Sequence, residues 1–243
     1  MKKESFSAKA QEKFHFKEIE QLRVPMENIV KKLYPKIAAG EYGLIFGDDA
    51  SGRIPALLLN EIIQGVYQEF GHKNPDIRFL AGSKDLEGGE KNQKKETISQ
   101  YLESLQKKNP ENFQKKVLIA TDVIATGVSL DPLIEVLKEK SIDFDVASVG
   151  DVTTEDVESK WGTEVYFGAS GLPKIFGLGS LSGVEKKTNE LFSHRIKDSD
   201  AYTDDEKEDM QININEARED VKRLAEEILE KTRKEKESKE NTL

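Results

Sequence analysis

The stretch VLIATDVIATGVS, residues 117–129, joins a buried strand to a helix. Its first five residues are apolar or small, which is typical of a strand that a parallel sheet covers on both faces. Asp122 then stands at the carboxyl end of the strand. A turn of small residues leads from there into an apolar helical segment that contains Leu130, Leu133 and Leu137. The pattern predicts a strand, a turn and a helix in direct succession.

The alternation of strand and helix continues on both sides of this unit. A short apolar run ends at Gly47, and a broad apolar helical face extends from Arg53 to Gly71. Strands that alternate with helices favour parallel pairing through crossover connections. We therefore expect an α/β fold with a mainly parallel sheet of about five strands flanked by helices, and a site at the carboxyl ends of the strands. The expected strands are residues 42–46, 77–81, 117–121, 144–149 and 165–167.

The pattern divides the chain into four segments. Residues 1–40 have apolar positions at helical spacing and are predicted to form a helical N-terminal segment. Residues 41–171 make up the α/β core. Residues 172–202 are a variable segment, whose glycine-rich first part, up to Gly183, is either a loop excursion or a sixth short strand. Residues 203–243 are predicted to form a charged C-terminal helix.

The C-terminal helix accounts for much of the charge of the chain. Residues 203–240 hold 14 acidic and 9 basic side chains, which is a net −5 of the total −9. Thr203 is the expected cap. Two interpretations stay open for the apolar seam: the helix docks on its own domain, or it forms the contact of a homodimer or with a protein partner. The seam consists of Ile214, Ala217, Val221, Leu224 and Ile228, at coiled-coil spacing.

The composition excludes several kinds of site and partner. The 243 residues include no cysteine and three histidines, so we expect no disulfide, no thiolate nucleophile and no imidazole-built metal centre. Neither an apolar run of about 18 residues nor the core of a signal peptide occurs, so we expect a cytoplasmic protein with no membrane contact. The net charge of −9 argues against binding of a nucleic acid duplex, because such binding depends on a basic face.

The turn after Asp122 has the chemistry of an anion site. Residues 126–129 offer backbone N–H groups, two hydroxyls and a helix N-terminus to one anion, which suits a phosphate. Asp122 can accept hydrogen bonds from sugar hydroxyls beside it. The alternative is purely structural: Asp122 caps the loop, and the Thr-Gly turn packs.

Residues 117–129 resemble the phosphoribosyl pyrophosphate motif of the type I phosphoribosyltransferases. That motif has four apolar residues, two adjacent acids, three variable residues, and then Thr-Gly with a small or hydroxylated residue. Here Thr121 replaces the first acid, and Asp122 is the second. The resemblance extends over roughly residues 40–170 and implies a phosphoribosyltransferase-like fold. It assigns the 5-phosphate to Ala125, Thr126, Gly127, Val128 and Ser129.

The resemblance also implies a pyrophosphate loop after the first core strand. There, Gly52 would allow close approach of the backbone to the ligand, and Arg53 would pair with phosphate oxygens. Asp48 and Asp49 would hold Mg²⁺ that is bound with the substrate, because Mg²⁺ commonly binds one or two carboxylates together with substrate phosphates. The alternative is a turn that caps the next helix. The loop consists of Asp49, Ala50, Ser51, Gly52 and Arg53.

Three further assignments depend on the resemblance. Residues 82–95 are expected to be a polar lid that resembles the catalytic loop of the family, with Lys84 as its catalytic lysine. Phe167 is assigned to stacking on a base, and packing in the core is the alternative for it and for Tyr166. The N-terminal segment and the residues after Gly171 are the candidates for a hood over the base.

The implied function is transfer of 5-phosphoribose from phosphoribosyl pyrophosphate to a nucleobase or similar nitrogen acceptor, with release of pyrophosphate. Asp122, Arg53 and Lys84 are the catalytic candidates. The reaction needs no protein nucleophile, which is consistent with a chain that lacks cysteine. The alternative is a catalytically silent protein of the same fold that binds phosphoribosyl pyrophosphate or a nucleotide as a regulator or partner-binding module.

Overall fold

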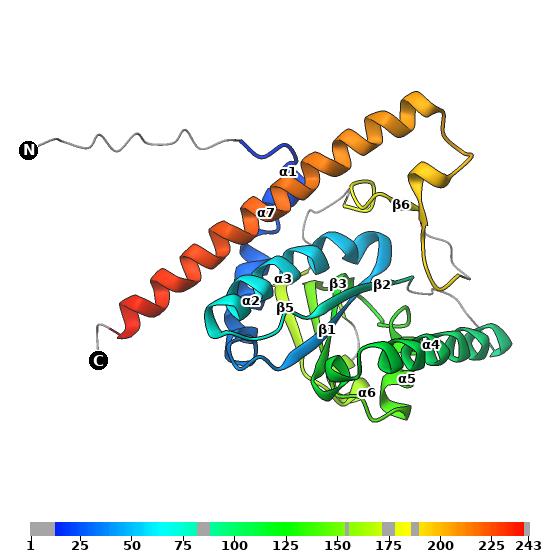
Figure 1. Ribbon diagram of the computed structural model, residues 1–243, viewed down its shortest axis with the longest axis horizontal. Coiled ribbons are helices and arrows are strands. Elements are labelled where there is room, and N and C mark those ends of the chain that lie inside the picture. The colour runs from blue at the N-terminus through cyan, green and yellow to red at the C-terminus, as the bar shows by residue number, and fades with distance from the viewer. Residues whose placement is uncertain (1–12, 82–87, 154–155, 172–177, 186–189, 241–243) are drawn as a thin grey trace, which may run out of the picture.

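All five strands that the sequence predicts are present and form one sheet (Figure 1). The computed structural model describes residues 13–81, 88–153, 156–171, 178–185 and 190–240. The sheet strands are β1 (Tyr42–Asp48), β2 (Asp76–Leu80), β3 (Lys116–Ile124), β4 (Phe144–Asp151) and β5 (Val165–Ser170). The short strands β6 (Val184–Glu185) and β7 (His194–Arg195) form a separate antiparallel pair.

Helices connect and cover these strands. The N-terminal segment contains α1 (Lys17–Glu20) and α2 (Arg23–Ala38), as its periodicity predicts. The connections within the core are α3 (Asp49–Phe70), α4 (Gly88–Lys108), α5 (Asp131–Glu139) and α6 (Val157–Trp161), with a 3-10 turn η1 (Pro110–Gln114) before β3. A second 3-10 turn, η2 (Ile196–Asp198), precedes α7 (Asp204–Glu240).

The strand order is β2-β1-β3-β4-β5, and every neighbouring pair is parallel. The expectation of a parallel α/β sheet of five strands is thus confirmed. The chain runs from β1 to one edge of the sheet and then, through β3, to the other edge. In doubly wound sheets of this order, ligands bind in the crevice at the carboxyl ends of the strands where the order reverses. Here that point lies between β1 and β3.

Helices cover both faces of the sheet (Figure 1). α2, α3 and α7 pack on one face, toward Ile45, and α4, α5 and α6 pack on the other, toward Phe46. Side chains alternate between the two faces along a strand. Asp48 and Thr121 therefore belong to the face of α4 and α5, whereas Asp122 belongs to the face of α3.

α7 lies across α3, and its apolar stripe is buried (Figure 1). The Glu206 N–H donates to Thr203 Oγ1 at 3.3 Å, and the Thr203 N–H donates to the Glu206 carboxylate at 2.8 Å, which is a reciprocal capping box. Gly65 permits close approach of the two helices, since a Cβ there would lie 2.5 Å from Leu229 Cδ1. The cap at Thr203 is confirmed, and the helix docks on its own domain. Its buried apolar positions are Ile214, Ala217, Val221, Leu224, Ala225, Ile228 and Leu229.

The start of α4 corrects one prediction. The helix begins at Gly88, so the expected lid over residues 82–95 is wrong for 88–95. Sequence reasoning missed this part of the helix because one of its buried positions is Lys94 rather than an apolar residue. The aliphatic part of a lysine side chain can cover apolar surface, as the apolar side chains further along this helix do. Lys84 lies outside the described residues. The buried face of α4 consists of Lys94, Ile98, Leu102 and Leu105.

The glycine-rich segment before α7 is expected to be a loop excursion or a sixth short strand. Within the glycine-rich stretch at 172–183, residues 178–183 form turns, and the remainder lies outside the described residues. β6 follows and pairs Val184 with Arg195 of β7.

In the part of the chain that the structure describes, no helix has both the length and the apolar character that crossing a bilayer requires.

The docking of α7 predicts a difference between two apolar residues of the same helix. Leu224 is fully buried in the layer with α3, whereas Ile212 is 51% exposed. We expect Leu224→Ala to lower the free energy of unfolding by about 2–5 kcal/mol, because it removes packed methyl groups and leaves a cavity. Ile212→Ala should change it by about 0.5 kcal/mol or less. Equal effects of the two variants in urea unfolding would contradict the docked position of α7.

Candidate functional site at the carboxyl edge of the sheet

Two carboxylates and one hydroxyl meet where β1 and β3 end. Thr121 is 2% exposed, and its Oγ1 lies 3.3 Å from Asp48 Oδ2 and 3.4 Å from Asp122 Oδ1. A threonine hydroxyl has one proton, so Thr121 can donate fully to only one of the two carboxylates at a time. Asp48 is buried, at 9% exposure, and Asp122 is half-buried. The residue that replaces an acid in the motif therefore lies between two acids.

The first turn of α3 begins at this cluster. Residues 49–53, expected as a pyrophosphate loop, are helical, because α3 follows β1 without a loop. Asp48 is the N-cap residue, and the first N–H groups of a helix have no acceptor within it. A Cβ on Gly52 would lie 3.0 Å from the carbonyl oxygen of Ala120. Gly52 thus serves the packing of α3 on β3, and the amides of the first turn, including those of Ala50 and Ser51, are the donors at this edge.

Arg53 packs at the edge of the sheet next to β2. Its guanidinium carbon lies 4.0 Å from the centroid of the Phe79 ring, which is a cation–π contact. The side chain of Asp49 lies outside what the structure describes. Of the residues assigned to pyrophosphate and metal, Asp48 is therefore the one whose carboxylate is seen in the cluster.

The loop between β3 and α5 presents backbone donors. β3 continues to Ile124, and α5 begins only at Asp131, so the loop is longer than the predicted direct turn. Among the hydrogen bonds of the described residues, none is donated by the N–H groups of residues 126–129. The Leu130 N–H, in contrast, donates to the Gly127 carbonyl at 2.9 Å. Such N–H groups before a helix favour an anion.

α6 supports this loop from one side. Gly127 has a φ of +73°, and a Cβ there would overlap the ring of Trp161, which is 2% exposed. The Trp161 Nε1–H donates to Asp131 Oδ1 at 2.9 Å. Lys160 Nζ donates to Asp131 Oδ2 at 2.9 Å and to the carbonyl oxygen of Thr126 at 3.2 Å. The local sequence carries no signal of these contacts, because residues 126–131 and 160–161 meet only in the folded chain.

A cavity of about 20 Å³ lies on the α4 and α5 side of the cluster. Asp48, Lys94 and Ser129 are its polar lining residues, and Lys94, at 5% exposure, donates to the backbone oxygen of Glu190. This volume suffices for about one water molecule. The cavity is therefore too small for a sugar phosphate. The other lining residues are Gly47, Leu80, Ala81, Ile98, Ile119, Leu130, Pro132 and Leu133.

The two aromatic residues of β5 lie on opposite faces of the sheet. Phe167 is half-buried against the layer of α4, α5 and α6. Tyr166 packs on the other layer, where Lys36 Nζ lies 5.2 Å from its ring centroid. Phe167 pairs with Ser148 of β4, which in turn pairs with Thr121 of β3. Phe167 is therefore two strands from the cluster, and base stacking by this residue stays a prediction.

The amino edge of the sheet holds a second charged cluster that is closed within the chain. Asp145 is buried and accepts hydrogen bonds from the Tyr42 hydroxyl at 2.8 Å and from Lys36 Nζ at 3.0 Å. Burial and the adjacent Asp145 carboxylate raise the pKa of Tyr42 above its ordinary value. Lys36 also pairs with Glu164 at 2.6 Å. These groups satisfy one another, so the cluster stabilises the fold rather than forming a site.

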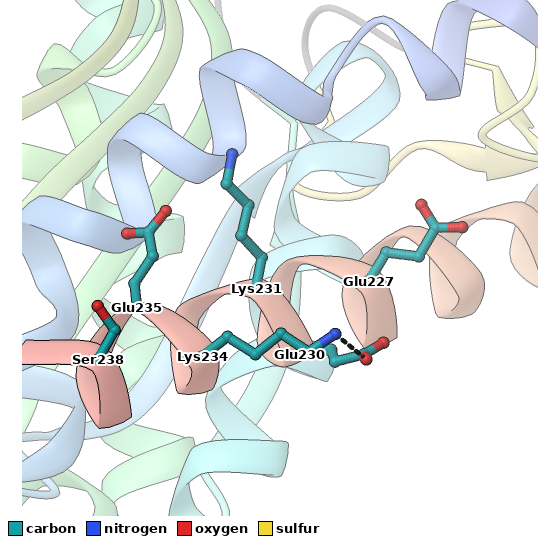
Figure 2. Close-up of a pocket in the computed structure, with 6 residues that line it drawn as sticks. All are labelled: Glu227, Glu230, Lys231, Lys234, Glu235 and Ser238. Carbon is teal, nitrogen blue, oxygen red and sulfur yellow. Dashed lines mark hydrogen bonds and ion pairs between the residues drawn. The ribbon is translucent and has the colours of Figure 1, made fainter. Parts of the chain in front are cut away.

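Figure 2 shows a hollow along α7, on the side where Lys231 points toward α2. Lys234 pairs with Glu230 at 2.5 Å on the same helix, and Lys231 reaches Glu27 of α2 at 2.6 Å. Paired charges of both signs on an exposed helix contribute little and attract no particular ligand. The carboxyl edge of β1 and β3 is therefore the candidate site. The hollow is lined by Glu227, Glu230, Lys231, Lys234, Glu235 and Ser238.

The donor set at the carboxyl edge suits a cation that arrives with a phosphate ligand. Within the described residues, no three histidine or acidic side chains gather closely enough to hold a metal ion. Asp48 and Asp122, with the hydroxyl of Thr121, supply hard oxygen donors. Mg²⁺ prefers such oxygens and commonly binds one or two carboxylates together with substrate phosphates and water. The residues present therefore fit Mg²⁺ bound with its ligand.

Searches of protein-family models, curated proteins and solved structures gave no match to this chain. We therefore infer its function from its own residues, from the motif at 117–129 and from the geometry of the carboxyl edge.

The shared hydroxyl of Thr121 can be tested by two substitutions. Thr121→Val keeps the size of the side chain but removes the donor between Asp48 and Asp122. We expect the free energy of unfolding to fall by about 1–3 kcal/mol, because a buried acceptor loses a hydrogen bond. Thr121→Ser keeps the hydroxyl and should lose about 0.8 kcal/mol for the missing methyl group. A larger loss for serine than for valine in urea unfolding would show that the hydroxyl does not stabilise the cluster.

Proposed function

We propose that this chain is a Mg²⁺-dependent phosphoribosyltransferase that binds phosphoribosyl pyrophosphate at the carboxyl edge of β1 and β3. The observation that carries the proposal is the loop at residues 126–129. Its N–H groups donate to no acceptor among the described residues, and it begins close to Asp122. A carboxylate for sugar hydroxyls, followed by amide donors for a phosphate, matches the motif at 117–129.

The 5-phosphate occupies the loop in this proposal. The amides of residues 126–129 donate to its oxygens, and the N-terminal end of α5 adds a favourable dipole. The hydroxyls of Thr126 and Ser129 are available at the same place. Residues 125–129 include no cation, so the affinity depends on the alignment of neutral donors. Asp122 accepts hydrogen bonds from the ribose hydroxyls.

The pyrophosphate lies toward the N-terminus of α3. The first-turn amides, including those of Ala50 and Ser51, favour an anion there. Asp48 and Asp122 would repel that anion on their own. Mg²⁺, when bound with the substrate, supplies the positive charge that offsets this repulsion, and the oxygens of Asp48, Asp122 and Thr121 would hold it. Arg53 is a further cation in this turn.

The reaction forms a bond from the acceptor nitrogen to the anomeric carbon and breaks the bond from that carbon to pyrophosphate. The bonding electrons leave with pyrophosphate, and the proton of the acceptor nitrogen passes to solvent. Positive charge develops on the ribose in the transition state, and negative charge develops on the leaving group. The first-turn amides of α3 stabilise the leaving group, and Asp122 orients the ribose.

One observation favours a second candidate function, binding without turnover. Thr121 is buried between Asp48 and Asp122 and carries no charge of its own. Ribose is then held by one acid, which suffices for binding even where the orientation is too loose for transfer. A silent protein of this kind would bind phosphoribosyl pyrophosphate or a nucleotide as a regulator.

Two assays on the wild-type chain distinguish these functions. Thermal unfolding with phosphoribosyl pyrophosphate, with and without Mg²⁺, detects binding, and release of pyrophosphate across a panel of nucleobases detects turnover. We expect a rise in melting temperature that depends on Mg²⁺, and release of pyrophosphate with at least one base. Binding without release would support the silent protein. No shift with either mixture would contradict transfer from phosphoribosyl pyrophosphate, and the absence of a shift with nucleotides as well would contradict both functions.

Substitution of the motif residues tests the site itself. We expect Asp122→Asn to lower the rate of pyrophosphate release about a hundredfold, because the ribose loses its orienting carboxylate. Thr126→Ala should lower it as well by removing a hydroxyl from the phosphate loop. Asp143→Asn is the matched control: this exposed acid precedes β4 at the opposite edge of the sheet. Full activity of both motif variants would contradict the proposed site.

A further inference from the structure

The short helix α6 lies behind the loop of the proposed phosphate site and contacts it through two adjacent residues. Lys160 Nζ donates to the carbonyl oxygen of Thr126 at 3.2 Å, and the Trp161 ring fills the space next to Gly127. Both side chains also donate to the Asp131 carboxylate, each at 2.9 Å. Asp131 is the first residue of α5, so α6 is tied both to the loop and to the helix that follows it.

The contact of Lys160 determines how one peptide group is turned. In a trans peptide, the carbonyl of one residue and the N–H of the next point in opposite directions. A hydrogen bond from Lys160 Nζ to the Thr126 carbonyl therefore directs the Gly127 N–H away from α6. That N–H donates to no acceptor among the described residues.

The ring of Trp161 determines the conformation of the next residue. Gly127 adopts a left-handed φ of +73°, which favours glycine, and a Cβ would overlap the Trp161 ring. The Gly127 carbonyl accepts hydrogen bonds from the N–H groups of Leu130 at 2.9 Å and Asp131 at 3.2 Å. The peptide group before Gly127 is thus held by Lys160, and the peptide group after it is held by the N–H groups at the start of α5.

We infer that Lys160 and Trp161 are positioning residues, which direct the Gly127 amide into the phosphate site. Neither residue touches the ligand. The inference rests on the proposed function for the identity of the ligand, but the contacts themselves belong to the free protein. The ammonium of Lys160 already faces the Asp131 carboxylate, so it acts by holding a carbonyl rather than by attracting an anion over a distance.

Lys160→Met tests this role against Lys140→Met, which removes the same charge. Lys140 follows α5, about 13 Å along the axis from its first residue, and pairs with Glu103 at 2.7 Å. Trp161 is the one tryptophan in the sequence, so the tryptophan fluorescence reports on the surroundings of this ring, which include the loop. Three quantities are to be measured. They are the dissociation constant of phosphoribosyl pyrophosphate with Mg²⁺, followed by this fluorescence; the melting temperature; and the amide resonance of Gly127 in the free protein.

We expect Lys160→Met to raise the dissociation constant about tenfold, since one loop donor is no longer aligned. Its melting temperature should stay within about 2 °C of wild type, because Lys160 is exposed. The Gly127 amide resonance should move in Lys160→Met and stay in place in Lys140→Met. An unmoved resonance together with unchanged affinity would overturn the positioning role and leave the proposed function standing.

Failure of the proposed function gives a different result. If the wild-type protein binds no phosphoribosyl pyrophosphate, the proposed ligand is wrong, and the Gly127 resonance of the free protein decides the positioning role. A displaced resonance in Lys160→Met alone would then support it. Equal spectra of the two variants would overturn it.

Discussion

β1 and β3 pair in parallel with Gly47 opposite Ala120, and this register determines what the carboxyl edge of the sheet contains. It brings the last residue of β1, Asp48, beside Thr121, which contacts Asp122 on its other side. The same pairing sets α3 against β3, where Gly52 leaves room for the backbone of Ala120. A shift of one of these strands by one residue would turn its side chains to the opposite face of the sheet and separate Asp48 from Thr121.

The two edges of the sheet differ in how their polar groups are satisfied. At the amino edge, Asp145, Lys36 and Tyr42 bond to one another. At the carboxyl edge, two acids lie on either side of one hydroxyl, and the loop after Ile124 has amides that donate to no acceptor in the described parts of the chain. Amides of this kind gain from a bound anion. This difference is why we locate function at the carboxyl edge.

Much of the fold could be predicted from the sequence because it follows from periodicity. Short, mainly apolar segments between helical stretches identified all five strands, and the cap at Thr203 identified the start of α7. Two predictions failed where the local pattern misleads. The polar stretch at 88–95 is helical because the stem of Lys94 is buried in place of an apolar residue, and the glycine at position 52 lies in a helix rather than a loop. The order of residues along the chain does not show that a lysine stem is buried or that a glycine lies where two elements pack closely.

The site was predicted in part, for a similar reason. Asp122 and the loop after it stand in one continuous motif, so the sequence sufficed to find them. Trp161 and Lys160 reach that loop from another connection of the sheet, about 34 residues further along the chain than Thr126, and no local pattern links them. Contacts between separate connections depend on tertiary packing, which single-sequence reasoning does not provide.

The central claim is that the amides of the loop bind the 5-phosphate of phosphoribosyl pyrophosphate. A crystal structure of the protein with this ligand and Mg²⁺ tests it most directly. The distances to measure are those from the phosphate oxygens to the backbone nitrogens of Gly127 and Val128. We expect values of about 2.7–3.2 Å, with the ribose hydroxyls on Asp122. A ligand bound elsewhere, or loop amides turned toward protein acceptors, would contradict the claim.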